Sequence, residues 1–169
     1  MIKKPYFFFI LITATISAQQ DVSSAFVEKW DNSKNYLLDI AKAMPEEHYG
    51  FKPTDREMTF KEQLFHIIEN MDWLSLTYFT TDKHKKKDRT KIATKQQVLE
   101  EIRLAFDTAK NRIQSNPNAD LSQKADFFAG PKSKLQIMNL MQDHVTHHRG
   151  QIIVYLNMNQ IQPPKYVGW

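Results

Sequence analysis

Cysteine is absent from the sequence, and glycine occurs only four times in 169 residues. Without cysteine the chain can form neither disulfide bonds nor thiolate metal sites, and it cannot be a lipoprotein anchored through a cysteine. Sandwich and dinucleotide-binding folds use more glycine in turns and phosphate loops, so its scarcity favours an all-α protein. Hydrophobic residues make up 41% and charged residues 25% of the chain, which is typical of a single globular domain.

Positive charge is in small excess and is concentrated in two places. The chain has 23 basic and 19 acidic residues, and two of the lysines lie within the first four positions. Five more basic residues fall within residues 83–89, which contain no aromatic side chain. A nucleic-acid-binding surface needs basic residues spread over a face and interleaved with aromatics. We therefore predict no nucleic-acid partner and a solvated loop at residues 83–89.

The first eighteen residues differ in pattern from the rest of the chain. Two lysines precede an apolar run from Tyr6 to Ile16, and small residues follow it. This run is shorter than the ~20 residues that a membrane-spanning helix needs, and its flanks are those of a secretory signal. We expect residues 1–18 to be a signal peptide, and the exported domain to span 19–169 without stable membrane insertion. The location would be periplasmic or extracellular; an anchoring N-terminal helix is the alternative.

Four segments of the sequence have helical periodicity. The first, from about 22 to 44, ends at Pro45, since proline cannot continue a helix. The other three begin with capping-box patterns and end near residues 80, 115 and 159; their first residues are Thr59, Thr94 and Ser133. Four amphipathic helices of this length predict a four-helix bundle. The last loop, 116–132, is expected to fold back on the bundle.

Two histidines, His144 and His148, lie four residues apart in the fourth helix. This spacing places them about 40° apart around the axis and one turn apart in height, so both rings can reach one ion. His148 falls inside the apolar stripe of the helix and His144 at its edge, while His147 is expected to face elsewhere. A buried imidazole needs a polar partner. The pair is therefore either a hydrogen-bonded core pair or part of a site for a transition metal, because neutral imidazole is a common ligand.

A metal site needs a further ligand from another helix. His66 is the only histidine in a predicted helix other than the fourth, because His48 and His84 lie in predicted loops. It lies off the centre of its apolar stripe, on the side of Asn70 and Trp73. By periodicity alone His66 could lie on the surface or line a cleft between helices.

Several motifs of the chain resemble the DinB-like (DinB/YfiT) superfamily. The resemblance to the end of the family's sequence lies in His144-x-x-x-His148-Arg149-Gly150-Gln151, Tyr155-Leu156 and Pro163-Pro164-x-Tyr166. The resemblance to its earlier half lies in Met44-Pro45-Glu46-Glu47, Tyr49-x-Phe51-Lys52-Pro53, Thr59-Phe60 and Gln63-x-x-His66. The resemblance implies a four-helix bundle with a divalent transition metal (zinc, nickel, iron or manganese). The ligands implied are one histidine of the second helix and the pair of the last helix, which are His66, His144 and His148.

The resemblance also implies two kinds of reaction on a small-molecule substrate. Three protein ligands leave a coordination position open, where a metal can activate water or ionise a thiol. Relatives include metal-dependent hydrolases and thiol-dependent transferases or isomerases. Because export removes a protein from the thiols of the cytosol, we expect a hydrolase. A thiol transferase and a non-catalytic metal-binding module remain the alternatives, and the resemblance is compatible with a homodimer.

No residue stands out in the sequence as a general base. Glu69 and Asp143 lie within one turn of the predicted ligands, where either could orient a ligand ring or simply face solvent. Gln151 is expected to be structural. Arg149 is expected to form an ion pair on the surface.

Overall fold

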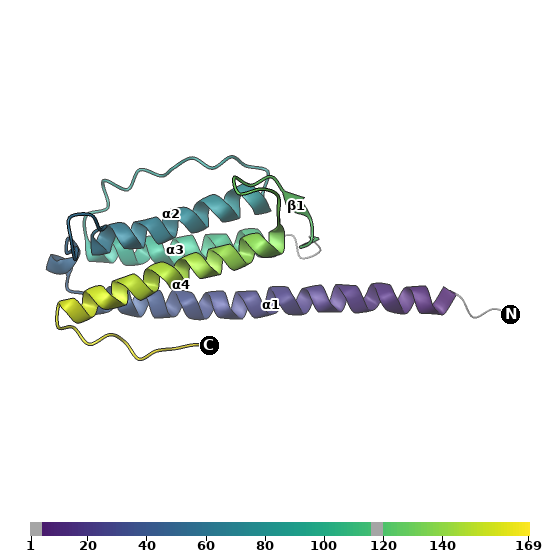
Figure 1. Cartoon of the computed structure of the whole chain (residues 1–169), viewed down its shortest axis with the longest axis horizontal. Coiled ribbons are helices and arrows are strands. Elements are labelled where there is room, and N and C mark those ends of the chain that lie inside the picture. The colour runs from purple at the N-terminus through teal and green to yellow at the C-terminus, as the bar shows by residue number, and fades with distance from the viewer. Residues whose placement is uncertain (1–4, 116–119) are drawn as a thin grey trace.

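The computed structural model describes residues 5–115 and 120–169, and it describes side chains from residue 22 onward. Four long helices form an all-α bundle (Figure 1), as the sequence predicts. They are α1 (Pro5–Ala43), α2 (Phe60–Phe79), α3 (Lys95–Gln114) and α4 (Lys134–Met158). A short 3-10 helix, η1 (Glu46–His48), follows α1. A two-stranded antiparallel ladder, β1 (Lys124–Ala125) with β2 (Lys132–Ser133), precedes α4 and is absent from the prediction.

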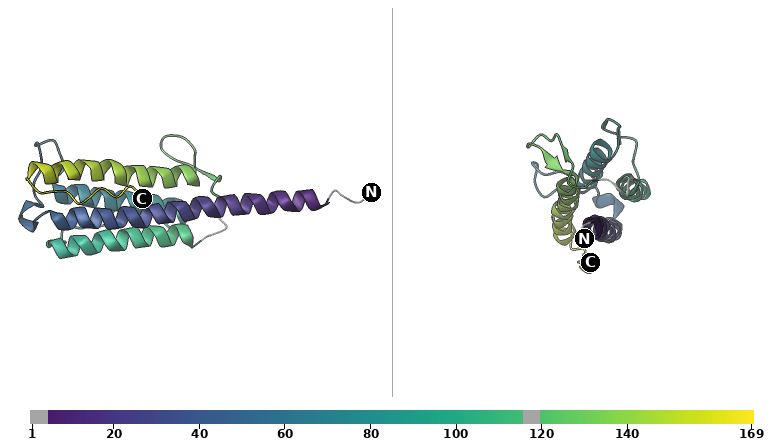
Figure 2. Two further views of the ribbon diagram at one scale, coloured as in Figure 1. Left: turned by 90° about the horizontal axis from the view of Figure 1, so that it is seen from below. Right: turned by 90° about the vertical axis from the view of Figure 1, so that its right-hand side faces the viewer.

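The two central helices of the sequence, α2 and α3, run parallel to each other (Figures 1 and 2). Both run antiparallel to α1 and α4. Helix α2 packs mainly against α3 and α4, and α1 packs mainly against the same two helices. A parallel pair requires the chain to return along the whole bundle, and residues 80–94 do this outside the helices (Figure 1). Since α2 has 20 residues and is therefore about 30 Å long, this crossover segment must be largely extended.

The predicted starts of the last three helices are confirmed. Thr59, Thr94 and Ser133 are the N-caps, and each has a complete capping box with the residue three positions later. The start of α1 differs from the prediction of about residue 22, because no glycine or proline lies between Pro5 and Pro45 to stop the helix.

The N-terminal part of α1 projects beyond the bundle (Figure 1). Of the predicted signal peptide, residues 1–4 lie outside the described residues, and the remainder belongs to this projecting part. Within the described chain, no helix combines the length and apolarity needed to span a membrane.

The bundle interior is closed by aromatic side chains. Trp30 is fully buried, its ring centroid lies 4.7 Å from that of Phe106, and its Nε1 donates to the Phe106 carbonyl at 3.0 Å. At the other end Tyr49 packs 5.3 Å from Phe60 and donates its hydroxyl to the Ala41 carbonyl at 2.8 Å. These bonds satisfy the polar atoms of large buried rings, which stabilises the helix packing that holds the site.

The described part of the last loop, residues 120–132, folds back on the bundle as expected; residues 116–119 lie outside the described residues. Phe127 is buried and stacks against Trp73 at 6.1 Å, and it also contacts Tyr78 at 5.9 Å. The C-terminal segment 160–169 returns along α1 (Figure 1), where Tyr166 meets Tyr36 edge-on at 6.2 Å. Both segments therefore pack on the bundle and complete a single domain.

Candidate metal centre

The structure brings His66 of α2 together with His144 and His148 of α4. The ring centroids of the three histidines are separated by 4.8, 4.5 and 4.4 Å. One nitrogen from each ring can be chosen so that the three lie within 4.8 Å of one another. His148 is buried, whereas His66 is exposed, so the cluster lies at the edge of the interface between α2 and α4.

The spacing of one pair of ring nitrogens fits a transition metal. Nitrogens that bind one zinc ion tetrahedrally at 2.0–2.1 Å are about 3.3 Å apart. Here the Nε2 atoms of His66 and His144 are 3.1 Å apart. The other ring nitrogen of His144, Nδ1, is buried without a hydrogen-bond partner in the described part of the chain. Apart from each other, the Nε2 atoms of His66 and His144 have no hydrogen-bond partner in the described residues, and a shared cation would satisfy both.

The orientation of His148 is fixed by two glutamine side chains. Its Nδ1 lies 2.7 Å from Oε1 of Gln63 and 3.0 Å from Oε1 of Gln151. A carbonyl oxygen only accepts, so Nδ1 must carry the proton and donate. Nε2 of His148 is then left unprotonated, which is the state that a metal ligand requires.

Gln63 is itself held by the protein interior. It is 1% exposed, and its Nε2 donates to the Tyr155 hydroxyl at 3.4 Å. Tyr155 in turn donates to the Met58 carbonyl at 2.9 Å. Sequence reasoning missed this role, although a signal was present, because Gln63 lies one helical turn before His66.

Burial and mutual repulsion keep the three rings neutral. Burial, with the charges of neighbouring histidines, lowers the pKa of His144 from 6.5 to about 3. Burial and His66 lower the pKa of His148 to about 4. The pKa of His66 is also lowered, first by burial and then by the ammonium of Lys86. Neutral imidazoles can bind a metal without first losing a proton, so the cluster is preorganised for a cation.

The acidic neighbours of the cluster bind elsewhere. Glu69 pairs with Arg89 and lies 3.0 Å from His84 Nε2, so it anchors the crossover segment to α2. Asp143 is exposed. Within residues 5–115 and 120–169, no hydrogen bond joins either carboxylate to one of the three histidines. The hypothesis that they orient a ligand ring therefore gains no support.

Two neighbours on α4 lie outside the three-histidine cluster. His147 is exposed, as expected for a residue that faces elsewhere, although its ring lies 4.8 Å from that of His148 and its Nε2 accepts from Gln151 at 3.1 Å. The predicted surface ion pair of Arg149 is wrong. Its side chain is buried with the guanidinium 5.0 Å from the ring of Tyr36, and burial lowers its pKa. Arg149 thus joins α4 to α1.

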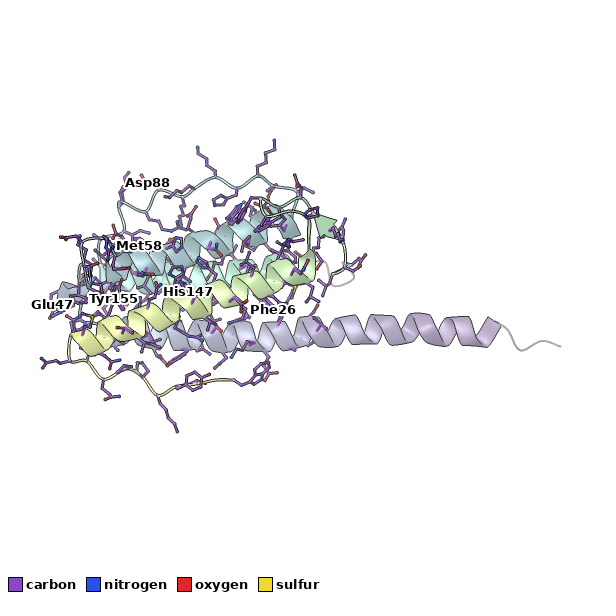
Figure 3. The ribbon with its side chains drawn as sticks, viewed as in Figure 1. Phe26, Glu47, Met58, Asp88, His147 and Tyr155 are labelled. Atoms are coloured by element: carbon purple, nitrogen blue, oxygen red, sulfur yellow. The ribbon has the colours of Figure 1, made fainter. Side chains whose placement is uncertain are left out.

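A cavity of about 850 Å³ lies between α2 and the crossover segment, and His66 is on its wall. Two residues that line the cavity are labelled in Figure 3. Met58 lies just before the start of α2, and Asp88 lies in the crossover segment. The segment is a largely exposed loop, as predicted, but two of its basic residues are held by ion pairs. Arg89 is 8% exposed and pairs with Glu69, and Lys87 pairs with Glu101 at 2.8 Å. These ion pairs hold the segment as a fixed wall beside the histidines.

The fold and its histidines define a four-helix bundle with a candidate metal centre between α2 and α4. The sequence matches the DinB family over residues 17–163, and the chain belongs to this family. The resemblance inferred from the motifs is thereby confirmed.

Solved structures of DinB-like proteins share this fold. A DinB-like protein from Bacillus cereus superposes with a TM-score of 0.73 at 18% identity, covering 85% of this chain and 97% of that one. The DinB-like protein YjoA from Bacillus subtilis has a TM-score of 0.66 at 14% identity, covering 84% and 96%. At these identities the likeness concerns the fold alone. No match was found among curated proteins.

Proposed function

We propose that this chain is a metal-dependent hydrolase that acts on a small molecule. The observation that carries the proposal is the position of the three-histidine cluster beside an open cavity. Small-molecule sites usually have volumes of about 300–1,000 Å³, and the cavity of about 850 Å³ next to His66 is of this size. A structural metal site would instead be closed by four protein ligands.

The residues of the chain have separate tasks in this proposal. His66, His144 and His148 hold a divalent ion such as zinc, nickel, iron or manganese, and Gln63 orients His148. When bound, such an ion supplies Lewis-acid activation of water. The low pKa values of the rings keep them neutral across the physiological range, so protons compete weakly for the site.

We also propose export of the protein. The two early lysines and the apolar run before residue 17 support it, as does the projection of the first turns of α1 beyond the bundle. Export favours hydrolysis over thiol transfer, because small thiol cofactors are abundant in the reducing cytosol.

The direct test is the metal content and activity of the purified chain. We expect about one divalent transition metal per chain, and loss of that metal in His66→Ala. His66 is exposed, so this variant should fold. His147→Ala is the matched control, since His147 is an exposed neighbour outside the three-histidine group.

Metal-loaded protein is then screened against esters, amides and thiol adducts. Hydrolysis that disappears in His66→Ala supports the proposal. Turnover that requires an added thiol would instead support the transferase alternative. Equal metal content in His66→Ala and the unaltered chain would refute the site, and bound metal without turnover would favour a non-catalytic module.

A further inference from the structure

The cavity beside His66 is lined by both charged and apolar side chains. Its lining includes four basic side chains and three carboxylates, together with Met58 and Phe65 as apolar surface. Two of the basic residues, Lys87 and Arg89, are already paired with Glu101. They fix the wall and are not available to a ligand.

The carboxylates of the lining are also engaged by the protein. Glu62 accepts from the backbone N–H of Thr59 at 2.8 Å and from its hydroxyl at 2.9 Å. Asp88 accepts from the backbone N–H of Thr90 at 2.9 Å. Glu69 pairs with Arg89. Each of these carboxylates therefore already has one oxygen engaged by a donor of the protein.

Lys86 differs from every other charged group of the lining. In the described ranges of the chain its ammonium makes no hydrogen bond or ion pair, while its charge is close enough to His66 to lower the pKa of that ring. Lys61 is the second cation without an acidic partner. It donates to the Ile92 carbonyl at 2.5 Å and lies 5.6 Å from the ring centroid of Phe65.

We infer that the cavity binds a small organic anion, with its oxyanion at Lys86 and Lys61 and its apolar part on Phe65 and Met58. In the described residues neither ammonium group has an acidic partner, which an anion would supply, and the half-buried ring and thioether would cover a hydrocarbon part. Lys86 is then a specificity residue, because it presents a charge to the cavity that His66 also lines. The inference rests on the proposed function and names the substrate class for the same site.

Binding of benzoate, benzamide and phenyl phosphate to the metal-free chain tests this inference. The three probes share a phenyl ring and differ in the group that meets Lys86. Ligand-observed saturation-transfer NMR measures their dissociation constants without any turnover. Metal-free protein is used so that an anion cannot bind through the ion. Benzoate should bind in the millimolar range and benzamide at least about three-fold more weakly, as an exposed charge pair predicts. The tighter of benzoate and phenyl phosphate indicates whether the natural group is a carboxylate or a phosphate.

The matched variants are Lys86→Gln and Lys85→Gln, which remove the same charge from neighbouring exposed positions. Lys85 is not part of the cavity lining. Lys86→Gln should weaken benzoate roughly three- to five-fold, and Lys86→Glu about ten-fold or more, while Lys85→Gln changes it by less than about two-fold. Equal binding of benzoate and benzamide, equal losses in the two glutamine variants, or no benzoate binding would overturn the inference. Each result is independent of metal content, so it can fail while the metal centre stands.

Discussion

Replacing Gln63 by leucine tests whether the hydrogen bond to His148 prepares the ring for a metal. Leucine has a similar volume and removes both the acceptor at 2.7 Å from Nδ1 and the weak bond to Tyr155. Loss of such a supporting partner typically lowers metal affinity 10- to 100-fold. Gln151 still accepts from Nδ1 at 3.0 Å in the variant, and Tyr155 keeps its bond to Met58. We therefore expect a loss near ten-fold, or about 1.4 kcal/mol.

Zinc affinity is measured by competition with a chelating dye at pH 7.5. Gln142→Leu is the control, because Gln142 is a hydrogen-bonded glutamine of α4 whose partner is Ser33, at 2.8 Å, and not a histidine. Nitrogen NMR of labelled histidine reports the tautomer directly. Protonation at Nδ1 of His148 should be dominant in the unaltered chain and less complete in Gln63→Leu. An affinity of Gln63→Leu equal to that of Gln142→Leu, with an unchanged tautomer, would refute the role assigned to Gln63.

Two further outcomes are expected. The stability of the metal-free chain should fall as the pH is lowered from about 6.5 toward 4. The folded-state pKa values of His144 and His148, about 3 and about 4, lie below the ordinary 6.5, so the unfolded chain binds more protons in this window. Urea midpoints between pH 7 and 4 should show a shallower slope for His144→Gln, and parallel slopes would contradict the assignment. Cell fractionation should recover the product outside the cytoplasm with about eighteen residues removed, and a full-length cytosolic product would argue for thiol transfer.

The features predictable from sequence were those set by local interactions. The N-caps Thr59, Thr94 and Ser133 were found because a capping box uses residues only three positions apart. The histidine pair of α4 was found because one turn of helix determines its spacing. His66 was ambiguous, since periodicity describes a helix against its core and not the groove between α2 and α4, where the ring meets its partners.

Features that depend on distant segments were missed. Arg149 is typical of a surface position in sequence, and only the approach of Tyr36 on α1 makes its burial favourable. The loop predicted at residues 83–89 is largely exposed, but its ion pairs were not predicted, because the partners Glu69 and Glu101 lie on two different helices. The parallel order of α2 and α3 determines both contacts, and no local pattern encodes that order.

The crossover segment forms one wall of the cavity but contributes little to the core of the bundle. Its residues 80–94 connect α2 to α3 from outside, while the buried apolar side chains that stabilise the bundle lie mainly on the four helices. Changes of length or charge in this segment would therefore alter one wall of the cavity and leave helix packing and the three histidines in place. A bundle built in this way could change the ligand that its cavity accepts through this one exterior segment, without any change in how its helices pack.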